Sequence, residues 1–494
     1  MKRFYLLFCL LLSITNVLKA EDAVLTVDVK TAGTLSTLIT SKQKWSTAKM
    51  KISGFLNGSD IKVIREMAGV NDKNQDTFGN LTDIDMTDVC FESGGDVYLS
   101  FFSTDTYEDI NCKTEDDVFP EYFFYGTAIK SIVLPSTIKK IGDCAFQNCP
   151  YLTSITIPSY VSEIGSNAFS GSGLTSIDIP NSVKKMGSYC FWGCTNMNIA
   201  TFNAAVTTIP EGTFSQTNIE TITLPEEVTE IGIGAFQYCY NLKTVNGGIN
   251  VKDIKNYAFN QCKFLETFTI HNKVESIGLQ SLANCGRLQS LSIPASVTYI
   301  SKSAFINDTT LAAINVDNDN ENYLSDNGVL YTKDGKTLLC CPGGMKEDVN
   351  VLSTTETIEE SSFDHCMYIK NLSLPASLKE IGNDAFNFSI ALNSIKCDAI
   401  EPPTIGWRGA FFYVPTTTCK LTVPTGSKAK YQQANGWKDF TNIVENDVNA
   451  IKSVYAPSTG EEYYDLNGVH MNTLKKGLII VRNANGKTTK MFKK

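Results

Sequence analysis

The sequence is poor in the residues on which most catalytic and metal sites depend. It has three histidines among 494 residues, and His271, His365 and His470 lie far apart along the chain. It has no Cys-x-x-Cys pair, no Gly-x-Ser-x-Gly motif and no glycine-rich phosphate loop. Because a nucleophile needs a base within hydrogen-bond reach and zinc needs clustered ligands, we expect no enzyme, no metal site and no cofactor.

Long apolar runs are missing beyond the first twenty residues. Residues 1–20 place Lys2 and Arg3 before an apolar stretch that ends at Leu18-Lys19-Ala20, the pattern of a cleaved secretory signal peptide. No later stretch approaches the roughly 20 apolar residues of a transmembrane helix. We therefore expect an exported protein, cell-surface or extracellular, without a transmembrane helix. The excess of 52 acidic over 43 basic residues argues against nucleic acid as a partner.

What the sequence does contain is a repeat with a period of 22 or 23 residues, marked by a phenylalanine that usually follows alanine. A fixed period of this size indicates stacked supersecondary units that share one continuous hydrophobic spine. Leu282 takes the same place in one unit, and the aromatic positions are Phe123, Phe146, Phe169, Phe191, Phe214, Phe236, Phe259, Phe305, Phe363, Phe386 and Phe411.

Each unit, or rung, is read from a phrase such as LTSITIPSYVSEIGSNAF in residues 152–169. Alternating apolar residues predict a short strand that proline ends, because proline lacks a peptide N–H. The V-x-x-I-G segment predicts a second short strand. Its glycine, for example Gly142, Gly165 or Gly232, is expected to supply a turn with positive φ. The phenylalanine is expected to lie buried between the two strands.

Of the 15 cysteines, all but Cys9 follow the expected signal peptide. Several stand three residues after the repeated Phe or Leu, where other rungs have Ser, Thr or Asp. This exchange predicts free thiols that fill a small slot in a turn, although stacked rungs could also bring neighbouring thiols near disulfide range. The cysteines at this position are Cys149, Cys194, Cys239, Cys262, Cys285 and Cys366.

The chain divides into four parts. Residues 1–20 are the signal peptide, 21–115 an N-terminal segment and cap, 116–445 the repeat array and 446–494 a small β module. The array is expected to carry a β-hairpin insertion at 317–350, around Asp334-Gly335. It is expected to end in a cap at 398–445, in which a last strand precedes a helix from about Ser427 that carries Trp437 and Phe440.

The phrase L-x-x-I-x-I-P-x-x-V-x-x-I-G-x-x-A-F-x-x-C resembles the BspA-like class of leucine-rich repeats, over roughly residues 45–445. The SGFLNGSDIKVIREMAG and GVLYTKDGKTL segments fit the same class. The YDLNGV and KKGLIIV phrases resemble secretion or sorting tails of anaerobic bacteria. The resemblance implies a mostly β, right-handed, horseshoe-like solenoid of about 11–13 rungs, displayed on the cell surface, and it carries over no catalytic residues.

Two sets of residues are candidate contact sites. Outward positions of the strand phrase are Thr156, Asp178, Thr223, Asn246, Thr269 and Ser292. They could form a face on which a partner docks, or could simply be tolerated on solvated strands. Aromatic residues in the rung-closing turns are Trp192, Tyr238 and Tyr240. These could stack on sugars or anchor a protein, or could shield the edge of the solenoid.

Three functions therefore remain open from the sequence. The first, which the resemblance favours, is adhesion or protein–protein interaction with host or bacterial surface macromolecules. The second is a glycan-binding surface module that uses the turn aromatics. The third is a passive structural spacer.

Overall fold

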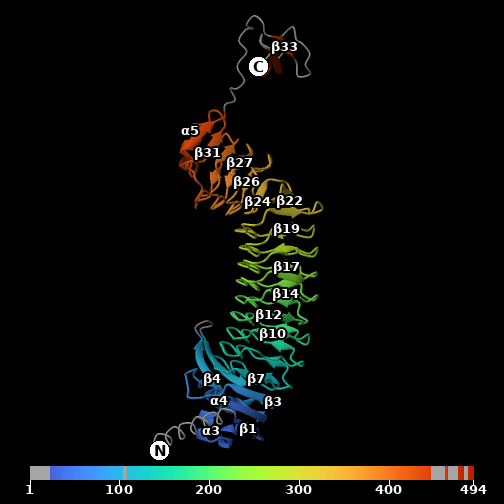
Figure 1. Ribbon diagram of the computed structural model, residues 1–494, viewed down its shortest axis with the longest axis vertical. Helices are drawn as coiled ribbons and strands as arrows, with labels where there is room; N and C mark the ends of the chain where they lie inside the picture. Colours follow the sequence, from blue (N-terminus) through green and yellow to red (C-terminus); the bar gives the residue numbers. More distant parts are fainter. Residues whose placement is uncertain (1–22, 104–107, 447–461, 465–476, 483–487, 494) are drawn as a thin grey trace, which may run out of the picture.

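The computed structural model describes residues 23–103, 108–446, 462–464, 477–482 and 488–493. The main body is a mostly β solenoid of short stacked coils with few helices, drawn out along one axis (Figure 1). The column bends mainly near the inserted strands and does not curve evenly as a horseshoe would. The predicted signal peptide, residues 1–20, lies outside the described residues.

The N-terminal cap joins three parallel strands to a helix. The strands β1 (Val24–Val29), β2 (Lys49–Leu56) and β3 (Asp83–Phe91) pair in that order, and β3 pairs with the first rung. Helix α4 (Gly58–Met67) begins at Asn57, whose side chain accepts from the Ser59 N–H. The cap also contains α2 (Leu35–Leu38), α3 (Ser41–Ser46) and a hairpin that the sequence did not predict, β4 (Gly94–Ser103) with β5 (Glu108–Thr114).

A buried arginine ties this cap to the first rung. Arg65 on α4 is fully buried, and its Nη1 donates to the carbonyls of Tyr122 (2.5 Å) and Phe123 (2.8 Å). Burial lowers the pKa of Arg65 to about 10. The first turn of the array is thus held in place by a charge-assisted contact from the cap.

The strand phrases form one side of the solenoid, as β7 (Ser131–Val133), β10 (Ser176–Ile179), β12 (Ile199–Phe202), β14 (Thr221–Leu224), β16 (Thr244–Gly247), β19 (Ser290–Ile293), β21 (Ala313–Val316), β25 (Val349–Asn350), β27 (Asn371–Leu374), β29 (Ser394–Cys397), β31 (Lys420–Val423) and β32 (Asn442–Glu445). Prolines directly follow several of them, as predicted. The strand predicted in residues 152–157 does not form, and the pairs β10-β12, β14-β16 and β19-β21 are separate two-stranded sheets.

A second series of two-residue strands lies on the other side of each coil. Their parallel pairing is continuous in three runs, β11-β9-β8-β6, β13-β15-β17-β18-β20 and β26-β28-β30. The series comprises β6 (Val118–Phe119), β8 (Lys140–Ile141), β9 (Glu163–Ile164), β11 (Lys185–Met186), β13 (Thr208–Ile209), β15 (Glu230–Ile231), β17 (Asp253–Ile254), β18 (Ser276–Ile277), β20 (Tyr299–Ile300), β26 (Thr357–Ile358), β28 (Glu380–Ile381) and β30 (Thr404–Ile405).

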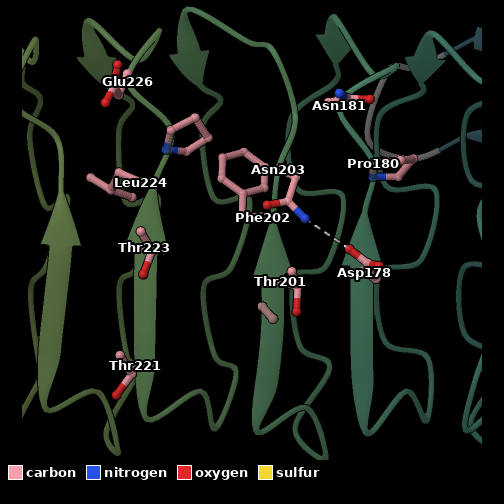
Figure 2. A pocket seen from close by; sticks show the side chains of 12 residues that line it. Asp178, Pro180, Asn181, Thr201, Phe202, Asn203, Thr221, Thr223, Leu224 and Glu226 are labelled. Atoms are coloured by element: carbon pink, nitrogen blue, oxygen red, sulfur yellow. Dashed lines mark hydrogen bonds between the residues drawn. The ribbon is translucent and has the colours of Figure 1, made fainter.

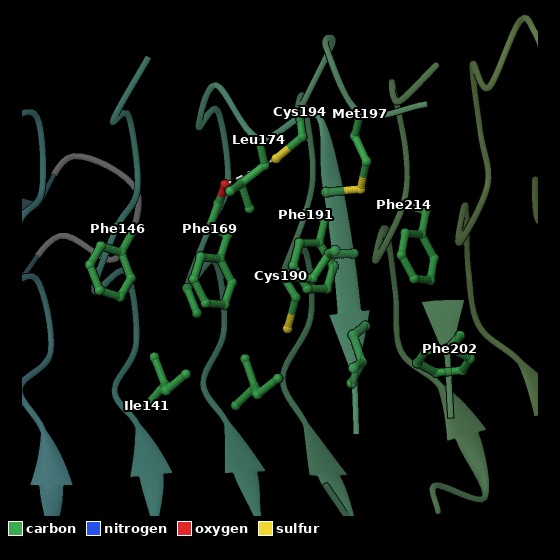
Figure 3. Close-up of a cluster of buried hydrophobic side chains, with 14 of the residues drawn as sticks. Ile141, Phe146, Phe169, Leu174, Cys190, Phe191, Cys194, Met197, Phe202 and Phe214 are labelled. Carbon is green, nitrogen blue, oxygen red and sulfur yellow. Dashed lines mark hydrogen bonds between the residues drawn. The ribbon is translucent and has the colours of Figure 1, made fainter. Parts of the chain in front are cut away.

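The repeated phenylalanines stack on one another between these two sides, as predicted. The rings of Phe146, Phe169 and Phe191 are fully buried, nearly parallel and 5.4 Å apart between successive centroids (Figure 3). We call the series from Phe124 to Phe411, with Leu282 in one rung, the phenylalanine ladder; its members are buried except for the half-buried Phe411. Its first member is Phe124 and not the predicted Phe123, because the Phe124 N–H donates to Ala145 O just as the Phe146 N–H donates to Ala168 O.

The glycine that recurs in the V-x-x-I-G segment does not supply positive φ, so that prediction is wrong. Gly142, Gly165 and Gly232 have ordinary φ values, and a Cβ on Gly232 would lie 2.5 Å from Ile209 O in the preceding rung. Glycine is needed there because two backbones approach closely. Positive φ occurs instead two residues before and two after each ladder position, as at Asn167 (φ 55°) and Gly171 (φ 65°).

The cysteine slot is a buried hydrogen-bonding position. The thiol of Cys194 donates to Phe169 O (3.1 Å) and that of Cys239 to Phe214 O (3.0 Å), in each case the ladder residue of the preceding rung. Ser389 occupies the same slot and donates to Phe363 O (3.0 Å). Cysteine and serine exchange here because both are small donors. The fourteen cysteines in the described residues are free thiols.

The insertion is a three-stranded meander that contains the predicted hairpin. Strands β23 (Val329–Thr332) and β24 (Thr337–Cys340) pair antiparallel around Asp334-Gly335, and β22 (Tyr323–Asp326), which was not predicted, pairs with β23. A two-residue turn, Asn327-Gly328, with positive φ at both residues, joins β22 to β23. Strand β24 then pairs parallel with β26 and so re-enters the coil.

The expectation of a single continuous spine is also wrong. The buried side chains form two clusters, one that ends with Tyr323 and Leu330 and one that begins with Val329 and Tyr331. No ring contact joins Phe305 to Phe363 among the described residues. We call the two parts the N-terminal stack (residues 117–316) and the C-terminal stack (residues 337–445). The insertion separates them because it replaces part of a rung.

At the C-terminal end, two aromatic residues cover the ladder as predicted, although not from the predicted helix. Helix α5 (Lys428–Gln433) ends before Gly436, whose φ of 76° turns the chain into the 3-10 helix η1 (Trp437–Asp439). Trp437 and Phe440 are buried edge-on against Phe411, at 5.3 and 5.1 Å between centroids. The predicted strand before this helix forms as β31, and a further strand that was not predicted, β32, follows η1 and pairs with it.

Three further strands are described near the C-terminus. They are β33 (Glu462–Tyr464), β34 (Gly477–Arg482) and β35 (Thr488–Lys493), paired antiparallel in that order. Residues 483–487, between β34 and β35, lie outside the described residues. That residues 446–494 form a separate module remains a prediction.

Candidate binding surfaces

The strand-side candidates point to solvent, but the structure gathers just two of them into one site. Thr156, Asp178, Thr223, Asn246, Thr269 and Ser292 are all exposed. Asp178 and Thr223 line a groove of about 910 Å³ at the C-terminal ends of β10, β12 and β14 (Figure 2). The other four residues lie outside this groove, on other rungs. We call this site the strand-side groove.

The groove exists because its middle rung differs from its neighbours. After β10 and β14 the chain makes a turn through Pro180-Asn181 and Pro225-Glu226, whereas the rung of β12 continues through Asn203-Ala204-Ala205. The two alanines replace larger turn residues, and no turn forms there. The recess between the flanking turns is therefore one rung wide, with Asn203 at its centre.

Polar groups converge on this recess from all three rungs. The Asn203 Nδ2 donates to the Asp178 Oδ1 at 3.4 Å, and Figure 2 shows both side chains facing the groove with Thr201 and Thr223. Glu226 adds a second carboxylate, and Phe202 with the two prolines adds apolar surface. No Lys, Arg or His is among the described residues that line it. The groove therefore suits a ligand with donor groups or positive charge.

The turn aromatics form a second, smaller hollow. Tyr238 and Tyr240 lie 6.0 Å apart between ring centroids and line a space of about 310 Å³ with Thr195, Gln216 and Asn218. The ammonium of Lys263 lies 4.8 Å from the Tyr240 ring centroid, which leaves a cation beside the hollow. We call this site the tyrosine hollow. Trp192, 40% exposed, does not line it, so the structure brings two of the three predicted aromatics together.

Sequence reasoning missed the residues that give each site its shape. Phe202, Asn203 and Glu226 were not singled out, and the signal that could have found the groove is the departure of residues 203–205 from the Pro-x-x-Val pattern. Gln216 and Asn218 were missed because they belong to the rung before the tyrosines.

In the described ranges, no three or more His, Cys, Asp and Glu side chains are placed to hold a metal ion. The helices in those ranges are too short or too polar to cross a bilayer.

Solved structures with a similar arrangement come from bacterial repeat proteins. A leucine-rich repeat protein from Bacteroides ovatus is 20% identical, with 74% of this chain and 84% of that chain covered and a TM-score of 0.47. A leucine rich cell surface protein from Faecalibacterium prausnitzii is 23% identical, with 73% and 96% covered and a TM-score of 0.45. A leucine-rich repeat protein from Eubacterium ventriosum is 24% identical, with 58% and 67% covered and a TM-score of 0.39.

No curated protein matches the chain. Residues 117–243, 207–327 and 345–425 match the family model of the BspA type leucine rich repeat region, in 6 copies. Together these stretches cover 117–327 and 345–425, more than half of the chain, and they coincide with the coils described above. The chain therefore belongs to the BspA type leucine rich repeat family.

Proposed function

We propose that this protein is an exported surface protein that adheres to a partner protein through its strand-side groove. Proteins of this repeat class bind other proteins in general, and extended solenoid faces suit that role. The observation that carries the proposal is the recess itself, where Asp178, Asn203 and Glu226 converge without a cation among the lining residues. The expected partner segment presents Lys, Arg or amide donors. A non-enzymatic role follows from this proposal.

The test is binding of the exported chain to immobilised extracellular-matrix proteins and to intact partner cells. A double variant, Asp178→Asn with Glu226→Gln, removes both groove carboxylates and should weaken binding and its salt dependence. The matched control, Asp319→Asn with Glu321→Gln, removes two exposed carboxylates of the insertion and should bind as the parent does. Equal binding by all three proteins would rule out the groove, and silence across the panel would favour a passive spacer.

Export and surface location belong to the same proposal. The predicted signal peptide and the C-terminal strands, which resemble a sorting tail, support an exported protein held at the cell surface. Surface proteolysis of intact source cells, compared with the culture supernatant, tests this location. Protection of the protein until the cells are lysed would contradict export.

A second candidate function is glycan capture at the tyrosine hollow. Two tyrosines beside the amides of Gln216 and Asn218 offer ring faces and hydrogen-bond partners of the kind that sugars use. On a glycan array, Tyr240→Ala should abolish any signal. Trp192→Ala, an aromatic truncation outside the hollow, should leave the signal intact. Loss with both variants, or with neither, would contradict a site in this hollow.

A further inference from the structure

Successive turns of the phenylalanine ladder are joined by peptide hydrogen bonds. In the rungs of Phe124 to Phe259, three N–H groups at alternate residues, centred on the ladder position, donate to carbonyls of the following rung, and the rung of Leu282 keeps two of these bonds. In the rung of Phe169 these bonds run from Asn167 to Ser188 (2.9 Å), from Phe169 to Cys190 (2.9 Å) and from Gly171 to Trp192 (2.7 Å).

This series stops at Phe305. Within the described residues, the N–H groups of Ser303, Phe305 and Asn307 make no hydrogen bond, although they hold the positions of the three donors. Ser303 (φ 58°) and Asn307 (φ 60°) keep the left-handed conformation found in the other rungs. The three donors therefore keep the same local backbone geometry but lack the next turn as acceptor.

The following turn is displaced because its rung is two residues short. Cys341 takes the ladder position there, since its N–H donates to Ser362 O (2.7 Å) and its carbonyl accepts from the Cys366 thiol (3.4 Å). Cys341 follows the inward residue of its short strand, Leu338, by 341 − 338 = 3 positions. In a complete rung Phe146 follows Ile141 by 146 − 141 = 5 positions.

A cleft of about 210 Å³ lies between the turn of Phe305 and this shortened turn. Ser303, Phe305 and Ile306 line one side, and Leu339 and Cys340 line the other. The lining is mostly apolar, and an ion pair between Lys302 Nζ and Glu359 Oε1 (2.8 Å) joins the two stacks beside it. On the rung of Phe363, the carbonyls of Glu360 and Asp364, which correspond to the outer acceptors of a complete rung, receive no backbone donor among the described residues.

We propose that this cleft binds an extended peptide segment of a partner protein that carries one large apolar side chain. Unpaired N–H groups at alternate residues are what an open sheet edge offers to an added strand. The apolar lining takes that side chain next to the ladder position, which Cys341 holds. Because other rungs form this site, it does not depend on the proposed role of the strand-side groove.

The probe is a fluorescein-labelled peptide, EIGNDAFNFS, which copies residues 380–389 and so the turn of a complete rung. Fluorescence anisotropy with the full exported chain should show saturable binding. The same peptide with the Phe386→Ala change should bind at least about tenfold more weakly, because it lacks the buried ring. Equal binding by the two peptides, or tighter binding of phenylalanine amide alone, would overturn the assignment to a peptide segment.

Two measurements locate the binding. Cys340→Phe places a ring in the cleft and should abolish binding, whereas Cys90→Phe, the same change at an exposed position in the cap, should leave it unchanged. Hydrogen exchange uses the unaltered protein, so its result does not depend on whether a variant folds correctly. The probe should slow exchange in residues 299–307 and leave the equivalent turn at residues 276–284 unchanged. Saturable binding without that local protection, or no saturable binding, would contradict the proposal.

Discussion

The two stacks are built from the same repeat but differ in how their cores continue. In the N-terminal stack, ring follows ring from Phe124 to Phe259 at 5.1 to 5.8 Å between centroids. The C-terminal stack has three stacked ladder rings, Phe363, Phe386 and Phe411, and is closed by Trp437 and Phe440. Since each rung is stabilised by its neighbours, one shortened turn without a ladder ring separates one spine into two.

The stacks also differ on their outer surface. Two residues after the ladder position, most rungs of the N-terminal stack place Asn or Gly, such as Asn148 and Gly171, which tolerate positive φ well. The exceptions are Gln216, Tyr238 and Gln261. The C-terminal stack places His365, Phe388 and Tyr413 there, stacked at 4.4 Å between successive centroids. Ring stacking on the outside thus accompanies a less favourable backbone conformation.

The largest expected effect comes from removing a ladder ring within the N-terminal stack. Phe236→Ala should lower the free energy of unfolding by about 3–5 kcal/mol, because the cavity lies between two neighbouring rings. Phe305→Ala should cost less, since Phe305 already borders the cleft. Urea unfolding of both variants measures the difference. Trp192→Ala, which removes an exposed aromatic, should cost less than about 1 kcal/mol, and an equal loss at all three positions would contradict the ladder.

A smaller loss is expected where two rungs approach most closely. Gly232→Ala should destabilise by about 1–3 kcal/mol, because the added Cβ would lie 2.5 Å from Ile209 O. Gly286→Ala is the matched control, with ordinary φ and its nearest atom, Lys263 O, at 3.4 Å. Thermal melts should separate the two variants. A control as unstable as Gly232→Ala would show that rung spacing is not the reason for glycine.

The buried thiols predict a pH dependence at alkaline pH. Burial raises the pKa of the Cys239 thiol from 9.0 to about 11 in the native state. The unfolded chain therefore loses the thiol proton at a lower pH than the native protein does. Stability is therefore full below about pH 9 and falls as the pH rises toward about 11. Cys239→Ser keeps a small donor in the slot and should flatten this decline. Exposed Cys90→Ser should leave it unchanged, and equal declines in both variants would refute a role for the buried thiol.

The smallest effect is expected on the outer ring row of the C-terminal stack. Phe388→Asn removes two ring contacts, which are typically worth about 0.5–1.5 kcal/mol each. It also relieves about 1 kcal/mol of left-handed strain. The net loss of unfolding free energy should therefore be about 0–2 kcal/mol. A loss as large as that of Phe236→Ala would mean that the outer row belongs to the core.

Periodicity alone predicted the features that every rung shares. The ladder, the cysteine slot and the prolines after strands follow residue identity within one repeat. The Asp334-Gly335 hairpin was read from its local pattern, whereas β22 and its turn at Asn327-Gly328 were not predicted. The role of Gly232 was missed because it depends on the distance between rungs. The strand-side groove was missed because it arises from a difference among three rungs at Ala204 and Ala205. The divided core was missed because it arises from a rung that is two residues short before Cys341.

Hydrogen exchange of the unliganded protein tests the central claim, that rungs are held by repeated turn-to-turn contacts which are interrupted once. The amides of residues 165–171 and 276–284, inside the N-terminal stack, should exchange slowly, whereas those of 303, 305 and 307 should exchange much faster because they lack acceptors. Uniformly slow exchange through residues 301–307 would contradict the interruption. Fast exchange at 165–171 would contradict the stacked ladder itself.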